Sequence, residues 1–304
     1  MLAAITVMHR STALIFRQTA IFLALLLAPA AMAQLQTGPP ASPPASPATS
    51  PANRLAALDV AALEPAARTA VAASLQEWRK LEAPPPGRWL LVNIPAFEIS
   101  LYDGAVRTAT WRAIVGKAKT ATPTFSGKAT GVILNPWWDV PASIVAESVG
   151  RIVARNPKRA AREGYVKQGD RYRQKPGPAN QLGEMKLDFA NAYSVGIHDT
   201  PSRSLFEKDK RAFSHGCIRV DDAFGFAAAL LGPPVSRDSL KTVAEQNRDT
   251  QRLPLAEPVP VFVGYFTAEV ADDGALRLFG DVYRRNPVAS AAAASTAAAG
   301  DCRS

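Results

Sequence analysis

The chain has 304 residues, of which 47% are hydrophobic and 20% are charged. This apolar content excludes a wholly disordered protein. The 35 Lys+Arg and 26 Asp+Glu residues give a net charge of +9, but the basic residues are spread along the chain, so no nucleic-acid partner is predicted. With two cysteines and three histidines, the composition excludes a disulfide-stapled mini-fold and a four-cysteine zinc site. These five residues are Cys217, Cys302, His9, His198 and His215.

Residues 1–33 have the pattern of a secretory signal peptide. Two arginines precede an uncharged apolar run over residues 20–33, which ends in Ala31-Met32-Ala33, a cleavage sequence of the A-x-A type. The run is shorter than the ~20 apolar residues of a membrane-spanning helix. We therefore expect export to the periplasm or cell envelope, with no membrane span after cleavage; an uncleaved N-terminal anchor is the alternative. Cleavage removes His9 and leaves a net charge of +7.

Three further segments flank the part of the chain that is expected to fold. Residues 34–54 are rich in proline and small polar residues and are predicted to be an extended linker. Residues 55–86 form an N-terminal helical segment, with apolar residues at helical spacing over 55–82 before a Pro-Pro-Pro-Gly sequence. The sequence leaves open whether this helix packs on the domain or stands as a stalk. Residues 286–304, which include Cys302, are predicted to be a disordered, alanine-rich tail.

Residues 87–285 have the pattern of one mostly β domain of the α+β class. Asp103-Gly104 is a hairpin signal between two runs of β-forming residues. Around residues 141–181 the pattern changes to helical periodicity over 142–163 and then to a basic, loop-like stretch over 164–178, and we interpret this part as an insertion that caps the domain. Strands are predicted at 88–94, 97–102, 105–115, 129–135, 193–198, 259–269 and 275–279, and covering helices at 222–231 and 237–248.

Both histidines of the exported chain and one cysteine lie within twenty residues, from His198 to Cys217. A lone cysteine near histidines is a candidate nucleophile, because imidazole can take the thiol proton or stabilise the thiolate. His215 precedes Cys217 by two residues, which in an extended chain separates them by about 6.5–7 Å, too far for a hydrogen bond. We therefore favour His198 as the general base, with His215 shaping the oxyanion side or the substrate pocket. Gly216 would allow a turn that exposes backbone N–H groups to the oxyanion.

Three other interpretations of these residues are open. The first is that the cysteine is inert packing and the histidines are structural. The second is a disulfide between Cys217 and Cys302, formed through a flexible tail as a redox switch. The third is a metal site, although the spacings match no zinc pattern; its ligands would be His198, Asp199, His215 and Cys217. We expect neither a metal nor a cofactor.

The order of these residues resembles the signature of the L,D-transpeptidase catalytic domain, the YkuD family. His198 is followed, at the family's spacing, by Ser214-His215-Gly216-Cys217 and then by Ile218-Arg219. Asn135-Pro136-Trp137-Trp138 and Leu182-Gly183 resemble the branch of the family that carries a capping insertion. The resemblance extends over roughly residues 88–232.

The resemblance implies a β-sandwich-like catalytic fold and acyl transfer on peptidoglycan. A cysteine thiolate attacks the bond between diaminopimelate and D-Ala of a tetrapeptide stem, D-Ala leaves, and the amine of a second stem resolves the thioester into a 3–3 crosslink. Such enzymes serve cell-wall biogenesis and cell shape and are acylated by carbapenems. The implied roles are Cys217 as nucleophile, His198 as general base, Ser214, His215 and Gly216 at the oxyanion hole and pocket, and Arg219 and Asp199 as supporting residues.

The acceptor is less determined than the donor. Stem peptides are expected as donor and acceptor, whereas relatives with this core attach a lipoprotein to the wall, exchange D-amino acids or hydrolyse such links; an inactive wall-binding module is a further alternative. The positive charge suits the carboxylates of stem peptides. We expect the basic insertion to act as a lid over the bound stem. Its basic residues are Arg151, Arg155, Lys158, Arg159, Arg162, Lys167, Arg171, Arg173 and Lys175.

Overall fold

The computed structural model describes residues 49–80 and 85–285. These residues belong to one compact unit, which begins at Ser46. The signal peptide predicted at 1–33, most of the predicted linker and the predicted tail with Cys302 lie outside the described residues. Within the described part, no helix is both long enough and apolar enough to cross a membrane.

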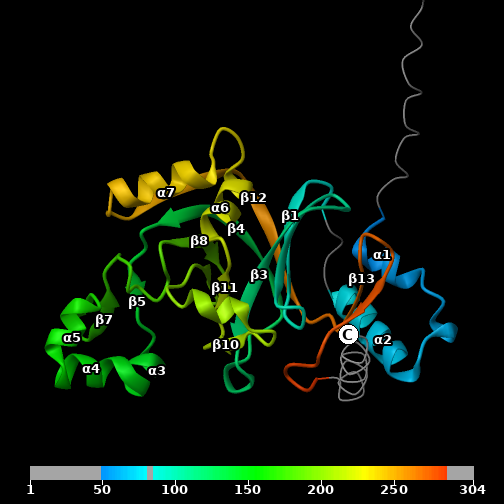
Figure 1. Ribbon diagram of the computed structural model, residues 1–304, viewed down its shortest axis with the longest axis horizontal. Coiled ribbons are helices and arrows are strands. Elements are labelled where there is room, and N and C mark those ends of the chain that lie inside the picture. The colour runs from blue at the N-terminus through cyan, green and yellow to red at the C-terminus, as the bar shows by residue number, and fades with distance from the viewer. Residues whose placement is uncertain (1–48, 81–84, 286–304) are drawn as a thin grey trace, which may run out of the picture. The chain divides into compact units, whose positions relative to one another are not determined.

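Among the described residues, a nine-stranded sheet forms the centre of the fold (Figure 1). Its strands follow the order β10-β3-β11-β9-β8-β4-β12-β1-β2, and β2 also pairs with β3, so that the hydrogen bonding closes on itself. The prediction of a mostly β fold is confirmed. The strands are β1 (Arg88–Asn93), β2 (Glu98–Asp103), β3 (Val106–Gly116), β4 (Phe125–Leu134), β8 (Met185–Ala190), β9 (Ile197–His198), β10 (Ala212–Ser214), β11 (Ile218–Val220) and β12 (Gln251–Gly264).

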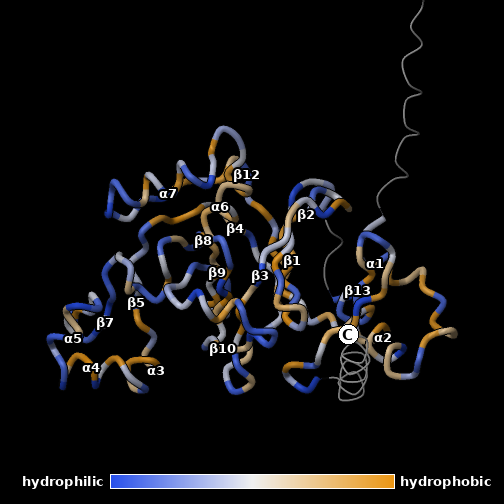
Figure 2. The backbone as a smooth tube through the Cα atoms, in the orientation of Figure 1, coloured by the Kyte–Doolittle hydropathy of each residue, from blue (hydrophilic) through white to orange (hydrophobic). Residues whose placement is uncertain are grey.

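Two helices, α6 (Ala223–Leu231) and α7 (Arg237–Gln246), pack against this sheet close to where the sequence predicts them. The predicted hairpin is also present, because β2 and β3 pair around Gly104, whose φ is +55°. Apolar segments of the strands and of α6 meet in the main core. Figure 2 colours the apolar segments of the backbone orange. The helices contribute Phe224, Phe226, Leu230, Leu240 and Ala244 to it, and the short 3-10 helices η2 (Ala118–Thr120) and η4 (Arg203–Glu207) connect strands.

The strand predicted at 193–198 is mostly wrong, since only Ile197 and His198 of this stretch form β9. The sheet instead contains β8, a strand that the sequence-based prediction lacks. Its buried residues alternate with half-buried charged ones over six residues, which is the pattern of a half-buried strand, so the signal for β8 is present in the sequence. The buried residues are Met185, Leu187 and Phe189.

The predicted insertion has a small sheet of its own, in the order β5-β7-β6, and a run of helices (Figure 1, green). We call residues 138–181 the cap. The stretch 164–178, predicted as a loop, forms the hairpin β6–β7 around Gly169, whose φ is +58°. The loop prediction is wrong because these short strands are mostly polar and lack clear alternation. The cap elements are β5 (Trp138–Asp139), α3 (Ala142–Ile144), the π-helix η3 (Val145–Val149), α4 (Gly150–Arg155), α5 (Pro157–Arg162), β6 (Tyr165–Gln168) and β7 (Arg171–Gln174).

The N-terminal segment is not the single helix predicted over 55–82. It forms α1 (Pro51–Ala56), the 3-10 helix η1 (Val60–Ala62) and α2 (Pro65–Lys80). A proline inside a helix lacks a backbone donor and clashes with the preceding turn, so Pro65 starts a new helix. Helix α1 begins at Pro51, within the segment predicted as linker, so helical structure starts earlier than expected.

Helix α2 packs against a C-terminal hairpin formed by β13 (Ala268–Val270) and β14 (Leu276–Leu278). The turn at Asp272-Asp273-Gly274 joins these two strands. The Oγ of Ser74 in α2 accepts a hydrogen bond from the Ala268 amide at 2.9 Å. The helix therefore packs on the domain and is not a free stalk. The shared apolar cluster contains Leu55, Ala70, Val71, Ala268 and Val270.

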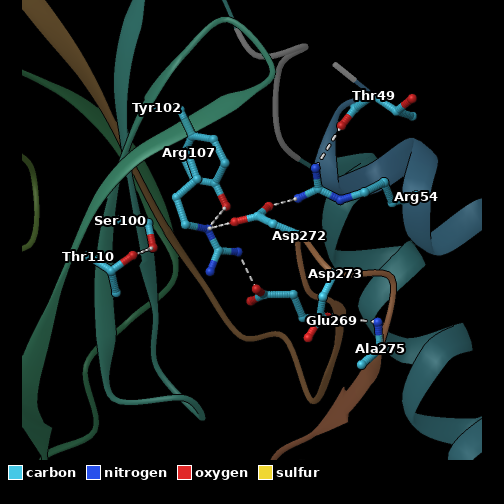
Figure 3. A network of polar contacts seen from close by, with 10 residues as sticks. All are labelled: Thr49, Arg54, Ser100, Tyr102, Arg107, Thr110, Glu269, Asp272, Asp273 and Ala275. Carbon is cyan, nitrogen blue, oxygen red and sulfur yellow. Dashed lines mark hydrogen bonds and ion pairs between the residues drawn. The ribbon is translucent and has the colours of Figure 1, made fainter. Parts of the chain in front are cut away.

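A polar network joins the two ends of the described chain to the β2–β3 hairpin (Figure 3). Arg107 donates to the Tyr102 hydroxyl at 3.0 Å and pairs with Glu269, and both side chains of this ion pair are 10% exposed. Arg54 of α1 pairs with Asp272 at 3.1 Å. Burial raises the pKa of Tyr102 to about 12, so this phenol keeps its proton at neutral pH.

Candidate active site

A cavity of about 410 Å³ lies between the cap and the central sheet. Its cap side includes Trp138, Ile144 and Ser148. The predicted site residues that line it are Cys217, His198, Ser214, His215 and Arg219. The fold therefore brings the candidate nucleophile and the candidate base to one cavity, together with most of the other predicted site residues.

Cys217 lies in the turn between β10 and β11 and is half-buried with a free thiol. Its Sγ accepts a hydrogen bond from the Gly196 amide at 3.4 Å, and the Ile218 amide donates to the Gly196 carbonyl at 2.8 Å. β11 runs parallel to β9 with Arg219 in register with His198. This strand pairing is what carries Cys217 and His198 to the same cavity.

The His198 side chain is well defined by its surroundings, since the residue is 4% exposed. Its Nδ1 lies 2.5 Å from the Asp199 carbonyl oxygen. A carbonyl can only accept, so Nδ1 carries the proton and Nε2 is left as the basic nitrogen. Burial, and to a lesser degree the positive charge of Arg219, lowers the pKa of His198 to about 4. The imidazole is therefore neutral at pH 7 and able to accept a proton.

The Ser-His-Gly-Cys turn is held together by the buried Ser214. Its hydroxyl donates to the Cys217 carbonyl at 2.5 Å and accepts from the Gly216 amide at 3.1 Å. Gly216 has a φ of +115°, which favours glycine, as the sequence predicts for a turn here. The Gly216 N–H is thus satisfied within the turn, whereas the Cys217 N–H has no acceptor among the described residues.

The His215 ring contacts the cap. Its Nε2 lies 2.8 Å from Oε2 of Glu147 in η3 and 3.4 Å from Nζ of Lys117. The imidazole is 37% exposed and the Glu147 side chain 54% exposed. His215 therefore lies at the edge of the cavity, between a carboxylate of the cap and an ammonium of the sheet domain.

Arg219 places a positive charge in the cavity wall. Burial lowers the pKa of its guanidinium, and the neighbouring Cys217 acts in the opposite direction. Its Nε is buried and has no hydrogen-bond partner in the described part of the chain. Because a half-buried guanidinium with an unpaired Nε is costly, this group suits an anionic ligand.

The Asp199 carboxylate is buried and stabilises the backbone next to the site. Its side chain is 2% exposed, accepts from the Glu184 amide at 2.9 Å and pairs with Arg203 at 2.7 Å. Burial raises the pKa of this carboxyl. A Cβ on Gly183 would come within 2.3 Å of Oδ2 of Asp199, so this approach requires glycine. The carboxylate thus fixes the end of the cap, while the main-chain carbonyl orients His198.

Several residues in or next to the cavity carry no clear sequence signal. Glu147 and Lys117 are ordinary charged residues in their local sequence, and only the fold brings them to His215. Tyr165 and Tyr193 line the cavity from positions predicted as loop or strand, whereas Trp138 belongs to a segment that the resemblance included. Within the described residues, no group of three His, Cys, Asp or Glu side chains is placed to hold a metal ion.

Comparison with known proteins gives two kinds of match. The model of the YkuD L,D-transpeptidase catalytic domain matches residues 87–244. A protein of Haemophilus influenzae (strain ATCC 51907 / DSM 11121 / KW20 / Rd) named "Putative L,D-transpeptidase" is 27% identical over 215 residues, which cover 64% of this chain and 44% of that protein. The chain thus spans less than half the length of this relative.

Solved structures similar to this chain include two from mycobacteria. An L,D-transpeptidase from Mycobacterium smegmatis is 14% identical with a TM-score of 0.32, and the match covers 58% of each chain. L,D-transpeptidase 3 from Mycobacterium tuberculosis, in complex with a faropenem-derived adduct, is 14% identical with a TM-score of 0.32, covering 59% of this chain and 60% of that one. At these TM-scores the assignment rests on the family match alone.

The family match extends over just over half of the chain. It includes the Ser-His-Gly-Cys turn, His198 and the whole cap. The chain belongs to the L,D-transpeptidase catalytic domain (YkuD) family.

Proposed function

We propose that this chain is a peptidoglycan L,D-transpeptidase of the cell envelope that acts through a thioester on Cys217. The observation that carries the proposal is that the fold brings the free thiol of Cys217 and the buried imidazole of His198 to one cavity. A free thiol and a neutral imidazole are the pair that nucleophilic acyl transfer requires.

In the first half-reaction, Nε2 of His198 takes the thiol proton and the thiolate attacks the carbonyl carbon between diaminopimelate and D-Ala. We assign the Cys217 N–H as the oxyanion donor, because the Gly216 N–H is bound to Ser214. The C–N bond then breaks, and D-Ala leaves after its nitrogen takes the proton from His198. The acyl group remains on sulfur as a thioester.

In the second half-reaction, the amine of a second stem attacks the thioester carbonyl. The new C–N bond forms, the C–S bond breaks, and the amine's proton passes through His198 to the departing thiolate. The products are a 3–3 crosslink and the free thiol. An amine of a wall-linked lipoprotein would resolve the thioester by the same steps.

Arg219 is the residue that we assign to the substrate's carboxylate. Stem peptides carry free carboxylates, and the Arg219 Nε faces no acceptor of the described chain. A guanidinium in a partly desolvated wall binds such a group strongly.

Hydrolysis of the stem is the second candidate function. The cap helix over the cavity buries only Val149 among residues 142–155, so water has a route to the thioester when the helix moves. A hydrolase would use the same Cys217 and His198 and release the tripeptide.

Adduct formation with meropenem tests the nucleophile and the base. Intact-mass measurement is expected to show one adduct on the wild type and none on Cys217→Ala. His198→Ala should acylate about 10²- to 10⁴-fold more slowly, because it lacks the general base. Equal rates for wild type and His198→Ala would refute His198 as the base, and an adduct on Cys217→Ala would refute the nucleophile.

A further inference from the structure

The helix of the cap that covers the cavity, residues 142–155, has an unusual geometry. Its central turn is a π-helix in which the Gly150 amide donates to the Val145 carbonyl. In a regular α-helix residues five apart point about 140° away from each other. The wider turn brings Ile144 and Val149 to the same cavity, together with Ser148. Such π-turns are frequent at functional sites.

This helix is weakly held by apolar packing. A second cavity of about 530 Å³ lies on its other side, lined among others by Ala142, Val145 and Ala146. Val149 is its one buried residue within the described structure. An element with few buried apolar contacts opens at a low free-energy cost. Polar contacts therefore have a large share in holding the helix over the cavity.

Among the described residues, a single polar side-chain contact connects this helix to the sheet domain. It is the 2.8 Å contact between Oε2 of Glu147 and Nε2 of His215. His215 itself is fixed in the turn that ends in Cys217. The contact thus connects the cap helix directly to the turn that carries the nucleophile.

We propose that Glu147 is a positioning residue for acyl transfer, which acts through His215 to hold the cap helix over the thioester on Cys217. This inference rests on the proposed function. With the helix in place, the acceptor amine forms the new C–N bond as the C–S bond breaks. With the helix displaced, water attacks instead, and the acyl group leaves as a carboxylic acid with the thiol restored. Glu147 thereby sets the ratio of transfer to hydrolysis.

The size of the effect follows from the exposure of the pair. An ion pair or hydrogen bond between side chains that are 37% and 54% exposed is weak, so its loss changes an equilibrium by about 1.5- to 5-fold. Lys117, 3.4 Å from the same nitrogen, belongs to the sheet domain and cannot replace the contact to the cap. A weak contact also allows the helix to open for the stem peptides.

The test compares Glu147→Ala with a matched variant of the same cap. Glu163 pairs with Arg159 at 2.7 Å entirely within the cap, so Glu163→Ala removes a carboxylate and an ion pair without touching the cavity. Glu147→Gln keeps an oxygen that can accept from His215. The full chain of each variant is incubated with a disaccharide-tetrapeptide, and amide hydrogen exchange of residues 142–155 is measured in parallel, with β4 and β8 as internal references.

We expect Glu147→Ala to exchange the helix amides about 1.5 to 5 times faster than wild type and to raise the tripeptide-to-dimer ratio by a similar factor. Glu163→Ala should match the wild type, and Glu147→Gln should lie between. An unchanged product ratio in Glu147→Ala overturns the inference, whether or not exchange is faster. Absence of any adduct on Cys217 in the wild type overturns the proposed function itself, and an adduct with products independent of Glu147 overturns this inference alone.

Discussion

The charge state of His198 is the residue-scale feature on which the proposed reaction depends. The Asp199 carbonyl fixes the proton on Nδ1, while burial and the charge of Arg219 lower the pKa of the ring to about 4. Above this pH the imidazole is neutral and can take the thiol proton; below it the ring is an imidazolium and cannot. The rate of Cys217 acylation should therefore fall as the pH drops through the pKa of His198.

Removing the charge of Arg219 should shift the pH dependence of Cys217 acylation. Without a neighbouring cation an imidazolium forms more easily, so the pKa of His198 rises in Arg219→Met. We expect the acid limb of the rate of carbapenem adduct formation to shift to higher pH. Arg219→Lys keeps a cation and should keep the limb near the wild-type position. An acid limb at the same pH in both variants and the wild type would show that Arg219 does not act on His198.

The residue types and their order predicted which side chains meet, but not how each of them is used. Cys217 and His198 could be singled out because cysteine and histidine are scarce in this chain. The contact of Asp199 with the loop at Gly183 and the contact of Glu147 with His215 depend on tertiary approach, which no local pattern encodes. The hydrogen bond from the Gly216 amide to the Ser214 hydroxyl could not be predicted from the sequence for the same reason.

At the scale of elements, the π-turn of the cap helix gives the cavity its outer wall. The turn depends on Gly150, because a Cβ at this position would come within 2.9 Å of the Val145 carbonyl oxygen. The same wide turn is what lets Ile144 and Val149 share one face. A regular α-helix would remove the close contact between a Cβ at position 150 and the Val145 carbonyl oxygen, but it would turn either Ile144 or Val149 away from the cavity.

Gly150→Ala should therefore disturb the cavity, although the substitution usually stabilises a helix by about 0.5–1 kcal/mol. Crowding of this kind costs about 1–3 kcal/mol, so we expect the second-order rate of Cys217 acylation to fall about fivefold or more. The measurement is adduct formation at several carbapenem concentrations, with amide exchange of residues 142–155 beside it. An unchanged rate together with slower exchange would mean that ordinary helix propensity prevails and that the π-turn has no role in the site.

Elements with a long, regular pattern were predictable, and elements that depend on partners were not. Helices α6 and α7 and the hairpin at Gly104 follow from periodicity and turn chemistry. The hairpin β6–β7 consists of two four-residue strands that are rich in polar residues, and their pairing comes from neighbouring strands, whereas β8 has a regular alternation that the sequence-based prediction lacks. The N-terminal helix is divided because Pro65 outweighs the apolar periodicity around it.

At the scale of the whole molecule, the folded domain extends beyond the family match at residues 87–244. β12 pairs with both β1 and β4, so the central sheet is incomplete without residues 251–264. Helix α2 also contributes, because Glu77, which is 7% exposed, accepts a hydrogen bond from the Tyr265 amide at 3.3 Å. These segments stabilise the part of the sheet formed by β1, β2 and β12. The cavity lies elsewhere, between the cap and the sheet.

Runs of β-forming residues, turn signals and a change to helical periodicity predicted the mostly β domain with its cap, and the scarcity of cysteine and histidine, together with the family resemblance, predicted Cys217 and His198 within it. The docking of the N-terminal segment onto the C-terminal hairpin joins residues nearly two hundred positions apart, as in the hydrogen bond from Ala268 to Ser74. A helix that makes contacts of this range has a periodic apolar face in its sequence, but the sequence does not indicate which segment packs against that face. For this reason the sequence could not decide between a helix packed on the domain and a free stalk.

Product analysis with a defined stem peptide tests the central claim most directly. The purified protein is incubated with a disaccharide-tetrapeptide, and protein and products are followed by mass spectrometry. The proposed function predicts a thioester on Cys217 that lacks the terminal D-Ala, followed by a 3–3 crosslinked dimer. A tripeptide without dimer would contradict transfer and identify a hydrolase, and the absence of both the thioester and any product would contradict an acyl-transfer enzyme altogether.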